Sequence, residues 1–167
     1  MILAFDTYYF GDQAKTVCLA FETWAATEAA MVYSETLVGI ANYVPGQFYK
    51  RELPCILSLL QQIDITNVKA IVVDGYVYLN DEHAPGLGRH LYDAVQRKIP
   101  IIGVAKSNFA TLNKSKLLLL RGSSINPLYI TSVGIDLQTA GQYIAAMTGL
   151  YRIPTLLKAL DRETKTV

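Results

Sequence analysis

The sequence predicts an α/β domain organised around a mixed β-sheet. Ala70 to Val73 is an unbroken apolar run, which is typical of a strand buried on both faces of a sheet. Strand-like segments dominate the first part of the chain, and helical and strand-like segments alternate after it. With 167 residues, 51% of them hydrophobic and 17% charged, the chain has the size of one globular domain, which we expect to span residues 1–167.

The N-terminal segments predict three antiparallel strands. Segments 1–10, 14–24 and 30–38 are rich in β-branched and aromatic residues and are joined by short connections, so we expect a meander. Asp6 falls inside the first segment. A carboxylate in such an apolar strand is costly unless it is hydrogen-bonded or holds a cation, and the sequence leaves both explanations open.

The middle of the chain predicts a parallel crossover. Segment 48–63 repeats apolar residues three or four apart, which indicates an amphipathic helix. After the central strand come a second amphipathic helix, about 87–97, and a second buried strand, 99–105. A strand–helix–strand unit joins parallel strands by a right-handed connection. It therefore places Asp74 and Lys106 at the same edge of the sheet, because each follows the C-terminal end of its strand.

The C-terminal part completes the pattern. Segments 117–121 and 128–132 predict a short hairpin, Asp136 can cap a helix that runs to about Thr148, and Pro154 opens a last short helix. The element order is that of the ribonuclease H-like fold. We expect a mixed sheet of the five-stranded type, an antiparallel N-terminal meander plus parallel strands, flanked by helices.

Four acids occupy the elements that converge in that layout. They lie in the first strand, the first helix, the fourth strand and the last helix, and they are Asp6, Glu52, Asp74 and Asp161. Neighbouring carboxylates repel one another unless divalent cations lie among them, and all-oxygen ligands favour Mg²⁺ or Mn²⁺. Such cations can activate a water and stabilise the leaving oxygen of a phosphodiester. Two simpler alternatives stay open: Asp74-Gly75 can be a plain turn signal, and Glu52 a solvated helix acid.

Composition limits the remaining possibilities. A net charge of +1 means that any nucleic-acid surface must be a local patch. Basic residues that border the acids could form one, namely Lys50, Arg51, Arg89, Lys106, Lys114, Lys116, Arg121 and Arg152. The chain shows neither a signal-peptide pattern nor a membrane-length apolar run. Cys18 and Cys55 lack metal-ligand spacing and fit buried thiols in a reducing compartment, so we expect a cytoplasmic protein without a membrane partner.

Four segments resemble one protein family. They read NYVPGQFYKRELP (42–54), IVVDGYVYL (71–79), PIIGVAKS (100–107) and LQTAGQYIAAMTGLYRIP (137–154). In this order they are similar to endonuclease V, a nuclease that cuts near deaminated purines, chiefly inosine. The resemblance implies a Mg²⁺-dependent endonuclease, with Mn²⁺ as a substitute, that hydrolyses phosphodiester bonds near deaminated bases in DNA or RNA. We expect it to act as a monomer.

The resemblance also implies residue roles. Asp6, Glu52 and Asp74 would be metal carboxylates, and Asp161 corresponds to the family's C-terminal acid or histidine near the metal. Lys106 would be a catalytic lysine that lies against the scissile phosphate or helps to protonate a leaving group. A wedge that separates the bases beside the lesion would consist of Tyr43, Val44, Pro45 and Gly46. Substrate contacts would also include Arg51 and Gly75, and the flipped base would be read near Gly75 and the loop after Lys106.

One segment departs from the family pattern. Where the family has histidines followed by an arginine pair, residues 76–86 read YVYLNDEHAPG, and Asp81 and Glu82 replace the basic residues. Phosphate contacts dominate nucleic-acid affinity, so we expect weaker binding or an altered substrate. Two alternatives therefore stay open. The chain could be a non-catalytic nucleic-acid-binding relative, or an α/β domain that binds a small phosphorylated ligand or a protein partner.

Overall fold

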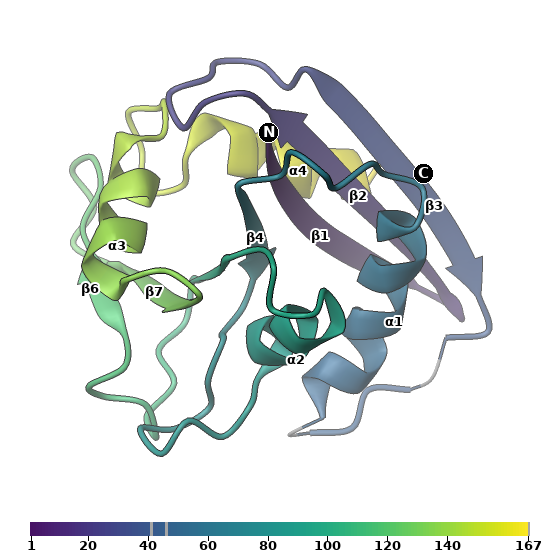
Figure 1. Ribbon diagram of the computed structural model, residues 1–167, viewed down its shortest axis with the longest axis horizontal. Coiled ribbons are helices and arrows are strands. Elements are labelled where there is room, and N and C mark those ends of the chain that lie inside the picture. Colours follow the sequence, from purple (N-terminus) through teal and green to yellow (C-terminus); the bar gives the residue numbers. More distant parts are fainter. Residues whose placement is uncertain (41, 46, 167) are drawn as a thin grey trace.

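The computed structural model describes the whole chain except residues 41, 46 and 167. The strands of these described residues form one sheet, and helices cover both of its faces, so the arrangement is α/β (Figure 1). The strands are β1 (Ile2–Phe10), β2 (Gln13–Phe21), β3 (Met31–Val38), β4 (Ala70–Asp74), β5 (Ile101–Ala105), β6 (Leu117–Leu119) and β7 (Leu128–Val133). The helices are α1 (Phe48–Leu60), α2 (Leu87–Ala94), α3 (Leu137–Ala146) and α4 (Thr155–Thr164).

The sheet has the order β3-β2-β1-β4-β5-β7-β6. Strands β1, β2 and β3 form the expected antiparallel meander, and β4 is parallel to both β1 and β5. The predicted hairpin β6–β7 joins the same sheet, because β7 pairs antiparallel with β5. The sheet therefore extends beyond the five-stranded type. Leu128 and Ile130 of β7 are fully buried, which explains why the hairpin lies on the β5 edge instead of standing apart.

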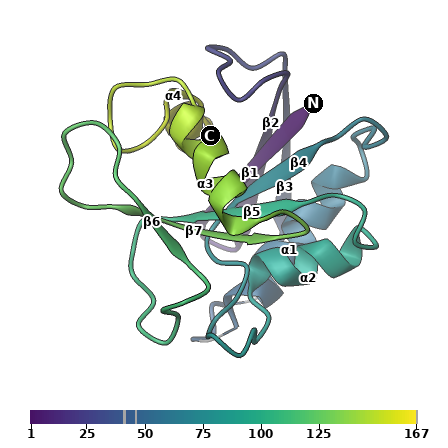
Figure 2. The same ribbon diagram turned by 60° about the vertical axis from the view of Figure 1, so that its left-hand side comes forward.

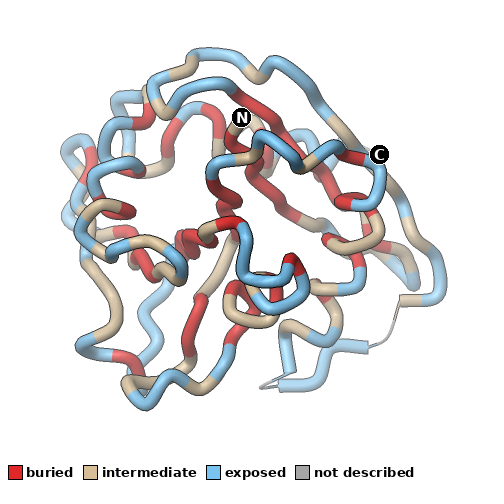
Figure 3. Tube along the Cα trace, in the orientation of Figure 1, coloured by how far each residue is buried: buried red, intermediate tan, exposed pale blue. Residues whose placement is uncertain are grey.

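Each face of the sheet buries its own core. Helices α1 and α2 cover one face, and α3 and α4 cover the other (Figure 2). Successive side chains of a strand point to opposite faces. Phe5 and Val73 therefore pack toward α1, whereas Ala4 and Val72 pack toward α4. The buried residues follow the strands through the centre of the molecule in Figure 3.

Several predicted elements end earlier in the structure. The first helix ends at Leu60 instead of 63, and the second strand ends at Phe21 instead of 24. Helix α2 ends at Ala94 because Gln96 and Arg97 adopt left-handed φ angles of 60° and 58°, which no helix continues through. Among the described residues no helix is both long and apolar enough to cross a membrane.

The turn after β4 depends on two glycines. Gly75 has a φ of +129°, a conformation that side chains disfavour. Gly103 of β5 lies directly beneath the turn, where an added Cβ would approach the Gly75 carbonyl oxygen to 2.5 Å and Thr131 Oγ1 to 2.6 Å. The backbone N–H of Val77 donates a 2.9 Å hydrogen bond to that same threonine oxygen. The chain can therefore leave β4 sharply and turn back over β5.

Candidate active site

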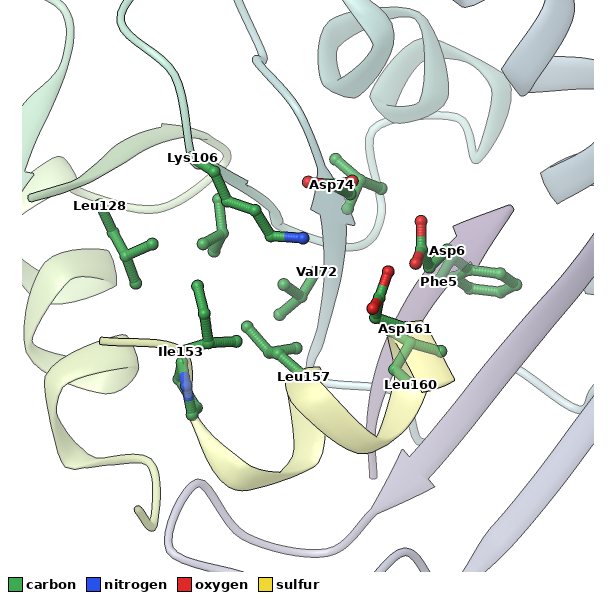
Figure 4. A pocket seen from close by; sticks show the side chains of 13 residues that line it. Phe5, Asp6, Val72, Asp74, Lys106, Leu128, Ile153, Leu157, Leu160 and Asp161 are labelled. Atoms are coloured by element: carbon green, nitrogen blue, oxygen red, sulfur yellow. The ribbon is translucent and has the colours of Figure 1, made fainter. Parts of the chain in front are cut away.

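Three carboxylates and a lysine lie in the lining of one small cavity, whose remaining walls are apolar side chains such as Val72 and Leu157. Asp6 on β1, Asp74 at the end of β4, Lys106 after β5 and Asp161 on α4 line a space of about 30 Å³ (Figure 4). Even-numbered residues of β1 and β4 face α4, so the sheet register itself turns Asp6 and Asp74 toward that helix. The cavity is large enough for a water molecule or a metal ion.

Asp6 is held in an environment that disfavours its charge. Its side chain is only 9% exposed, and its Oδ1 accepts a 2.9 Å hydrogen bond from the Thr7 backbone N–H. Desolvation, followed by the charge of Asp74, raises the pKa of Asp6 to about 7, although the Lys106 ammonium opposes that rise. Desolvation also raises the pKa of Asp74, again against the effect of Lys106. One lysine does not neutralise this pair of acids.

Glu52 reaches the same region from the opposite face of the sheet. It lies on α1, is 3% exposed, and its Oε2 accepts a hydrogen bond from the Tyr9 hydroxyl. Burial raises its pKa to about 7 even though the Tyr9 hydrogen bond lowers it, and the charges of Asp6 and Asp74 raise it further. The alternative that Glu52 is a solvated helix acid is therefore wrong. A carboxylate buried in this way among other acids is typical of a functional site.

Asp161 is shared between the cavity and a second lysine. Figure 4 shows its carboxylate beside Asp6. Its Oδ2 also forms a 3.1 Å salt bridge with the ammonium of Lys165, which lies one helical turn further along α4. The charge of Asp6 acts on Lys165 as well, and together with Asp161 it raises the pKa of Lys165. Sequence reasoning missed Lys165, although the spacing of four residues from Asp161 was visible.

The donor atoms suit a hard divalent cation, but they are not preassembled. Within residues 1–40, 42–45 and 47–166, no group of three or more His, Cys, Asp or Glu side chains already has metal-binding geometry. Glu52 is bonded to Tyr9, and Asp161 to Lys165. The acids nevertheless offer only oxygen ligands, and burial leaves their negative charge poorly compensated. A divalent cation fits that chemistry.

A larger cavity adjoins the carboxylates. It measures about 610 Å³ and shares Asp74 and Lys106 with the smaller one. Its remaining walls include Gly75, the segment after Lys106, and the aromatic residues Tyr43, Phe48, Tyr49, Tyr76 and Phe109. This is the region where the resemblance implied a base-reading pocket. Sequence reasoning missed most of its aromatic lining, because those rings come from separate segments and have no common periodicity.

One residue of the predicted wedge, Tyr43, lies in the lining of this cavity. Tyr43 is about half exposed, and Val44 and Pro45 are exposed. Gly46 lies outside the described residues. Arg51, for which the resemblance implied a substrate contact, packs against a tyrosine: its guanidinium carbon lies 3.6 Å from the centre of the Tyr9 ring. It thus supports the tyrosine that holds Glu52, and a substrate contact for Arg51 stays a prediction.

Two basic residues of the predicted groove donate hydrogen bonds to backbone carbonyl oxygens. Arg121 is buried, and its guanidinium donates to the carbonyl oxygens of Met147 at 2.6 Å and Tyr151 at 2.7 Å. Arg152 donates to the carbonyl oxygens of Lys106 at 2.6 Å and Pro127 at 2.7 Å. Neither is therefore an open phosphate contact. Arg152 instead fixes the backbone at Lys106.

Known proteins resemble the chain over nearly its full length. The sequence model of the family described as Endonuclease V matches residues 1–162. Endonuclease V of Trichormus variabilis is 29% identical over 90% of this chain and 73% of its own length. Endonuclease V of Streptomyces avermitilis is 30% identical over 91% of this chain and 74% of its own length.

Solved structures share the fold. The crystal structure of Endonuclease V from Streptomyces avermitilis superposes with a TM-score of 0.77 at 25% identity, covering 98% of this chain and 79% of the other. Ciona intestinalis Endonuclease V, in complex with a 24mer DNA that contains an inosine followed by a ribo-adenosine, superposes with a TM-score of 0.81 at 16% identity, covering 98% and 84%. The ribonuclease H-like fold is confirmed. Given the match over residues 1–162, the chain belongs to the endonuclease V family.

Proposed function

We propose that this protein is an endonuclease that hydrolyses a phosphodiester bond near a deaminated base, with inosine as the base, in DNA or RNA. Membership of the endonuclease V family supports a nuclease. The DNA in the Ciona intestinalis complex contains inosine, which supports the choice of base. In this proposal the chain acts in the cytoplasm as a monomer with a single domain.

The observation that carries the proposal is that two neighbouring cavities share two of their lining residues. Asp74 and Lys106 belong both to the carboxylate cavity and to the aromatic cavity of about 610 Å³. The larger volume lies in the range of small-molecule sites and accommodates a nucleobase between aromatic rings. A base held there brings its strand next to the carboxylates. Recognition and cleavage would therefore occur side by side.

The carboxylates and Lys106 would divide the chemistry. Asp6, Glu52, Asp74 and Asp161 would hold Mg²⁺, or Mn²⁺ in its place. When bound, the cation would activate a water and stabilise the charge that develops on the phosphate. The Lys106 ammonium is a compact cation at the junction of the cavities, where it can contact a phosphate oxygen or protonate the leaving oxygen. Backbone contacts from Arg152 keep the strand end beneath this lysine in place.

The aromatic cavity would receive an unstacked base. Extrusion of a base costs a few kcal/mol, and stacking on aromatic side chains offsets that cost. Tyr43, with Val44, Pro45 and Gly46, would fill the gap that is left in the strand. Gly75 leaves its side of the cavity open: among the described residues, the Phe48 ring, 3.6 Å from an added Cβ, is the one side chain that this Cβ would meet within 4 Å, apart from the chain neighbours of Gly75. A base could thus approach the backbone closely.

Cleavage of matched nucleic acids tests the proposal. We would compare single- and double-stranded DNA and RNA that contain one inosine with the same strands containing adenosine, in Mg²⁺ and then Mn²⁺. The variants are Asp74→Ala and, as a charge-matched control, Glu28→Gln. Glu28 is exposed in the β2–β3 connection, at the opposite end of β1 from the carboxylates. We expect metal-dependent cutting of the inosine strands by the parent chain and Glu28→Gln, and none by Asp74→Ala.

Other outcomes point to different functions. Binding of inosine strands without cutting would overturn the nuclease and favour a non-catalytic relative. If the chain neither cut nor bound the inosine strands, the remaining function would be binding of a small phosphorylated ligand or a protein partner. Equal cutting of inosine and adenosine strands would retain the nuclease and refute the assignment of the aromatic cavity.

A further inference from the structure

Two loops that are distant in the sequence are joined beside the aromatic cavity. The 76–86 loop follows β4, and the 107–116 loop follows β5. The Tyr76 hydroxyl donates to the Ser107 carbonyl oxygen at 2.6 Å, and Thr111 Oγ1 donates to the Leu79 carbonyl oxygen at 2.6 Å. His83 Nε2 and Ser115 Oγ lie 3.1 Å apart. These contacts join the two loops along much of their length.

Asp81 makes the most concentrated of these contacts. Its Oδ1 accepts backbone N–H donors from three successive residues, Asn113 at 3.0 Å, Lys114 at 2.8 Å and Ser115 at 3.2 Å. Such a set of converging N–H groups forms an anion-binding concavity, here filled by the chain's own carboxylate. Desolvation opposes ionisation, but the three N–H bonds outweigh it and hold the pKa of Asp81 below its usual value.

The 107–116 loop depends on this anchor. The loop contains neither helix nor strand, so the amides of 113–115 have no ladder or helical partner there. Asn80 supports the anchor from the other side, because its Oδ1 accepts from the N–H groups of Glu82 at 3.1 Å and Ala84 at 3.0 Å. The turn that presents Asp81 is therefore itself fixed.

The anchored loop is a wall of the aromatic cavity. Ser107 and Phe109 line the cavity from the 107–116 loop, and Tyr76 lines it from the 76–86 loop. The rings of Tyr76 and Phe109 lie 5.6 Å apart. A shift of the 107–116 loop would therefore change both the width of the cavity and the position of its aromatic surface.

From these contacts we propose that Asp81 is a positioning residue that fixes the base-binding wall and so sets affinity and selectivity for the base. The inference rests on the proposed function. It reverses the expectation from sequence, in which Asp81 and Glu82 replace the basic residues that would contact phosphates and so weaken binding or alter the substrate. If the acid repels phosphates, it weakens substrate binding, and its removal should strengthen binding. If the acid positions the loop, it strengthens substrate binding, and its removal should weaken binding.

Glu82 provides the matched control. It is the next residue, carries the same charge and is exposed, and within the described part of the chain its carboxylate makes no hydrogen bond to protein. Asp81→Ala and Glu82→Ala thus remove the same charge from the same loop, and only the first removes the anchor. Asp81→Asn removes the charge but keeps an oxygen that can accept the three N–H groups.

The experiment measures KM, kcat and amide exchange on the full chain. Substrates are the inosine strand and its adenosine and guanosine counterparts. We expect Asp81→Ala to raise KM for the inosine strand about ten- to a hundredfold, to reduce preference for inosine, and to change kcat less. Hydrogen exchange at residues 113–115 should accelerate with it. Glu82→Ala should leave exchange unchanged and keep or lower KM, and Asp81→Asn should lie between Asp81→Ala and the parent.

Opposite outcomes would overturn the inference. If Asp81→Ala and Glu82→Ala lower KM alike, the acids act by repulsion. If exchange accelerates in Asp81→Ala while KM and selectivity stay at parent values, the anchor does not serve the site. If Asp81→Ala does not fold, Asp81→Asn decides by the same two readouts. A parent chain that neither cuts nor binds inosine strands refutes the proposed function, whereas the exchange data report separately on the anchor.

Discussion

The Tyr9 hydroxyl donates a 2.5 Å hydrogen bond to Glu52 Oε2 and thereby ties β1 to α1. Tyr9 lies three residues beyond Asp6, on the opposite face of the same strand. The Arg51 guanidinium lies over its ring at 3.6 Å. Arg51 and Tyr9 thus support the one candidate carboxylate that approaches from the α1 side of the sheet. Residues that orient ligands in this way tune metal affinity without contacting the metal.

Tyr9→Phe tests this support. The variant keeps the ring beneath Arg51 but removes the hydrogen bond that lowers the pKa of Glu52, so ionised Glu52 becomes less available at neutral pH. We expect the affinity for Mn²⁺ at pH 7 to fall about tenfold, as measured by isothermal titration calorimetry. Tyr8→Phe serves as the control, because Tyr8 is the neighbouring strand residue and is exposed. Unchanged Mn²⁺ affinity in Tyr9→Phe would refute a supporting role for the hydroxyl.

The burial of Asp6 predicts how stability depends on pH without metal. Its pKa rises from the ordinary value of 3.8 to about 7 on folding, so between these values the folded state binds more protons than the unfolded state. Stability is therefore greatest below pH 4 with respect to this group and falls as pH rises through 7. Asp6→Asn removes that penalty. We expect it to raise the free energy of unfolding at pH 8 by about 2 kcal/mol, or about 4–8 °C in melting temperature.

The same variant should lose stabilisation by metal. A cation that binds the folded state raises the melting temperature with concentration, and Asp6→Asn removes one of its proposed ligands. We expect Mg²⁺ to raise the melting temperature of the parent chain at pH 8 and to have little effect on Asp6→Asn. Thermal unfolding with and without EDTA measures both effects. A variant that is less stable than the parent without metal at pH 8 would contradict the proposed origin of the penalty.

Lys165 is predicted to compete with a cation. Its ammonium forms the 3.1 Å bridge to Asp161, and the charge of Asp6 also raises its pKa. Lys165→Met should free Asp161 and remove a nearby positive charge, so Mn²⁺ affinity should rise severalfold. Lys158→Met, an exposed position on the same helix, controls for the change in net charge. Equal gains in both variants would show a general charge effect, and a loss in Lys165→Met would show that the lysine supports the site.

Sequence periodicity predicted the elements, because periodicity is a local pattern, and the order of those elements in the ribonuclease H-like layout predicted which acids converge. The alternation of β1 and the apolar run of β4 fix which face Asp6 and Asp74 occupy once the strands pair. The chain order was enough to bring Asp161 to the same cavity as these two acids. Helix ends were less well predicted. The left-handed residues Gln96 and Arg97 that end α2 carry no glycine or proline signal.

Contacts between distant loops could not be predicted in this way. The three hydrogen bonds of Asp81 to residues 113–115 link segments more than thirty residues apart. No periodicity relates such segments, and their registration depends on the packed sheet beneath them. The sequence therefore suggested only that Asp81 stands in place of a basic residue, whereas in the structure it accepts hydrogen bonds from the backbone of residues 113–115. Phe48 and Phe109 meet at one cavity for the same tertiary reason.

Gly103→Ala should damage the site through the turn above it. Its Cβ would lie 2.5 Å from the Gly75 carbonyl oxygen and 2.6 Å from Thr131 Oγ1, so the 75–77 backbone must move away from β5. Forced overpacking of this kind costs about 1–3 kcal/mol of unfolding free energy, which urea denaturation measures. Because Gly75 borders the aromatic cavity, inosine cleavage should fall well beyond the fraction of chain that unfolds.

A glycine elsewhere separates the steric effect from simple backbone strain. Gly11 has a φ of +58°, and an added Cβ there meets nothing within 4 Å. Gly11→Ala should therefore cost only about 1 kcal/mol and leave cleavage by the folded chain unchanged. If Gly103→Ala retained full cleavage when folded, the turn over β5 would not control the cavity. A loss of cleavage in Gly103→Ala alone would connect the shape of that turn, set by a residue in another strand, to recognition of the substrate.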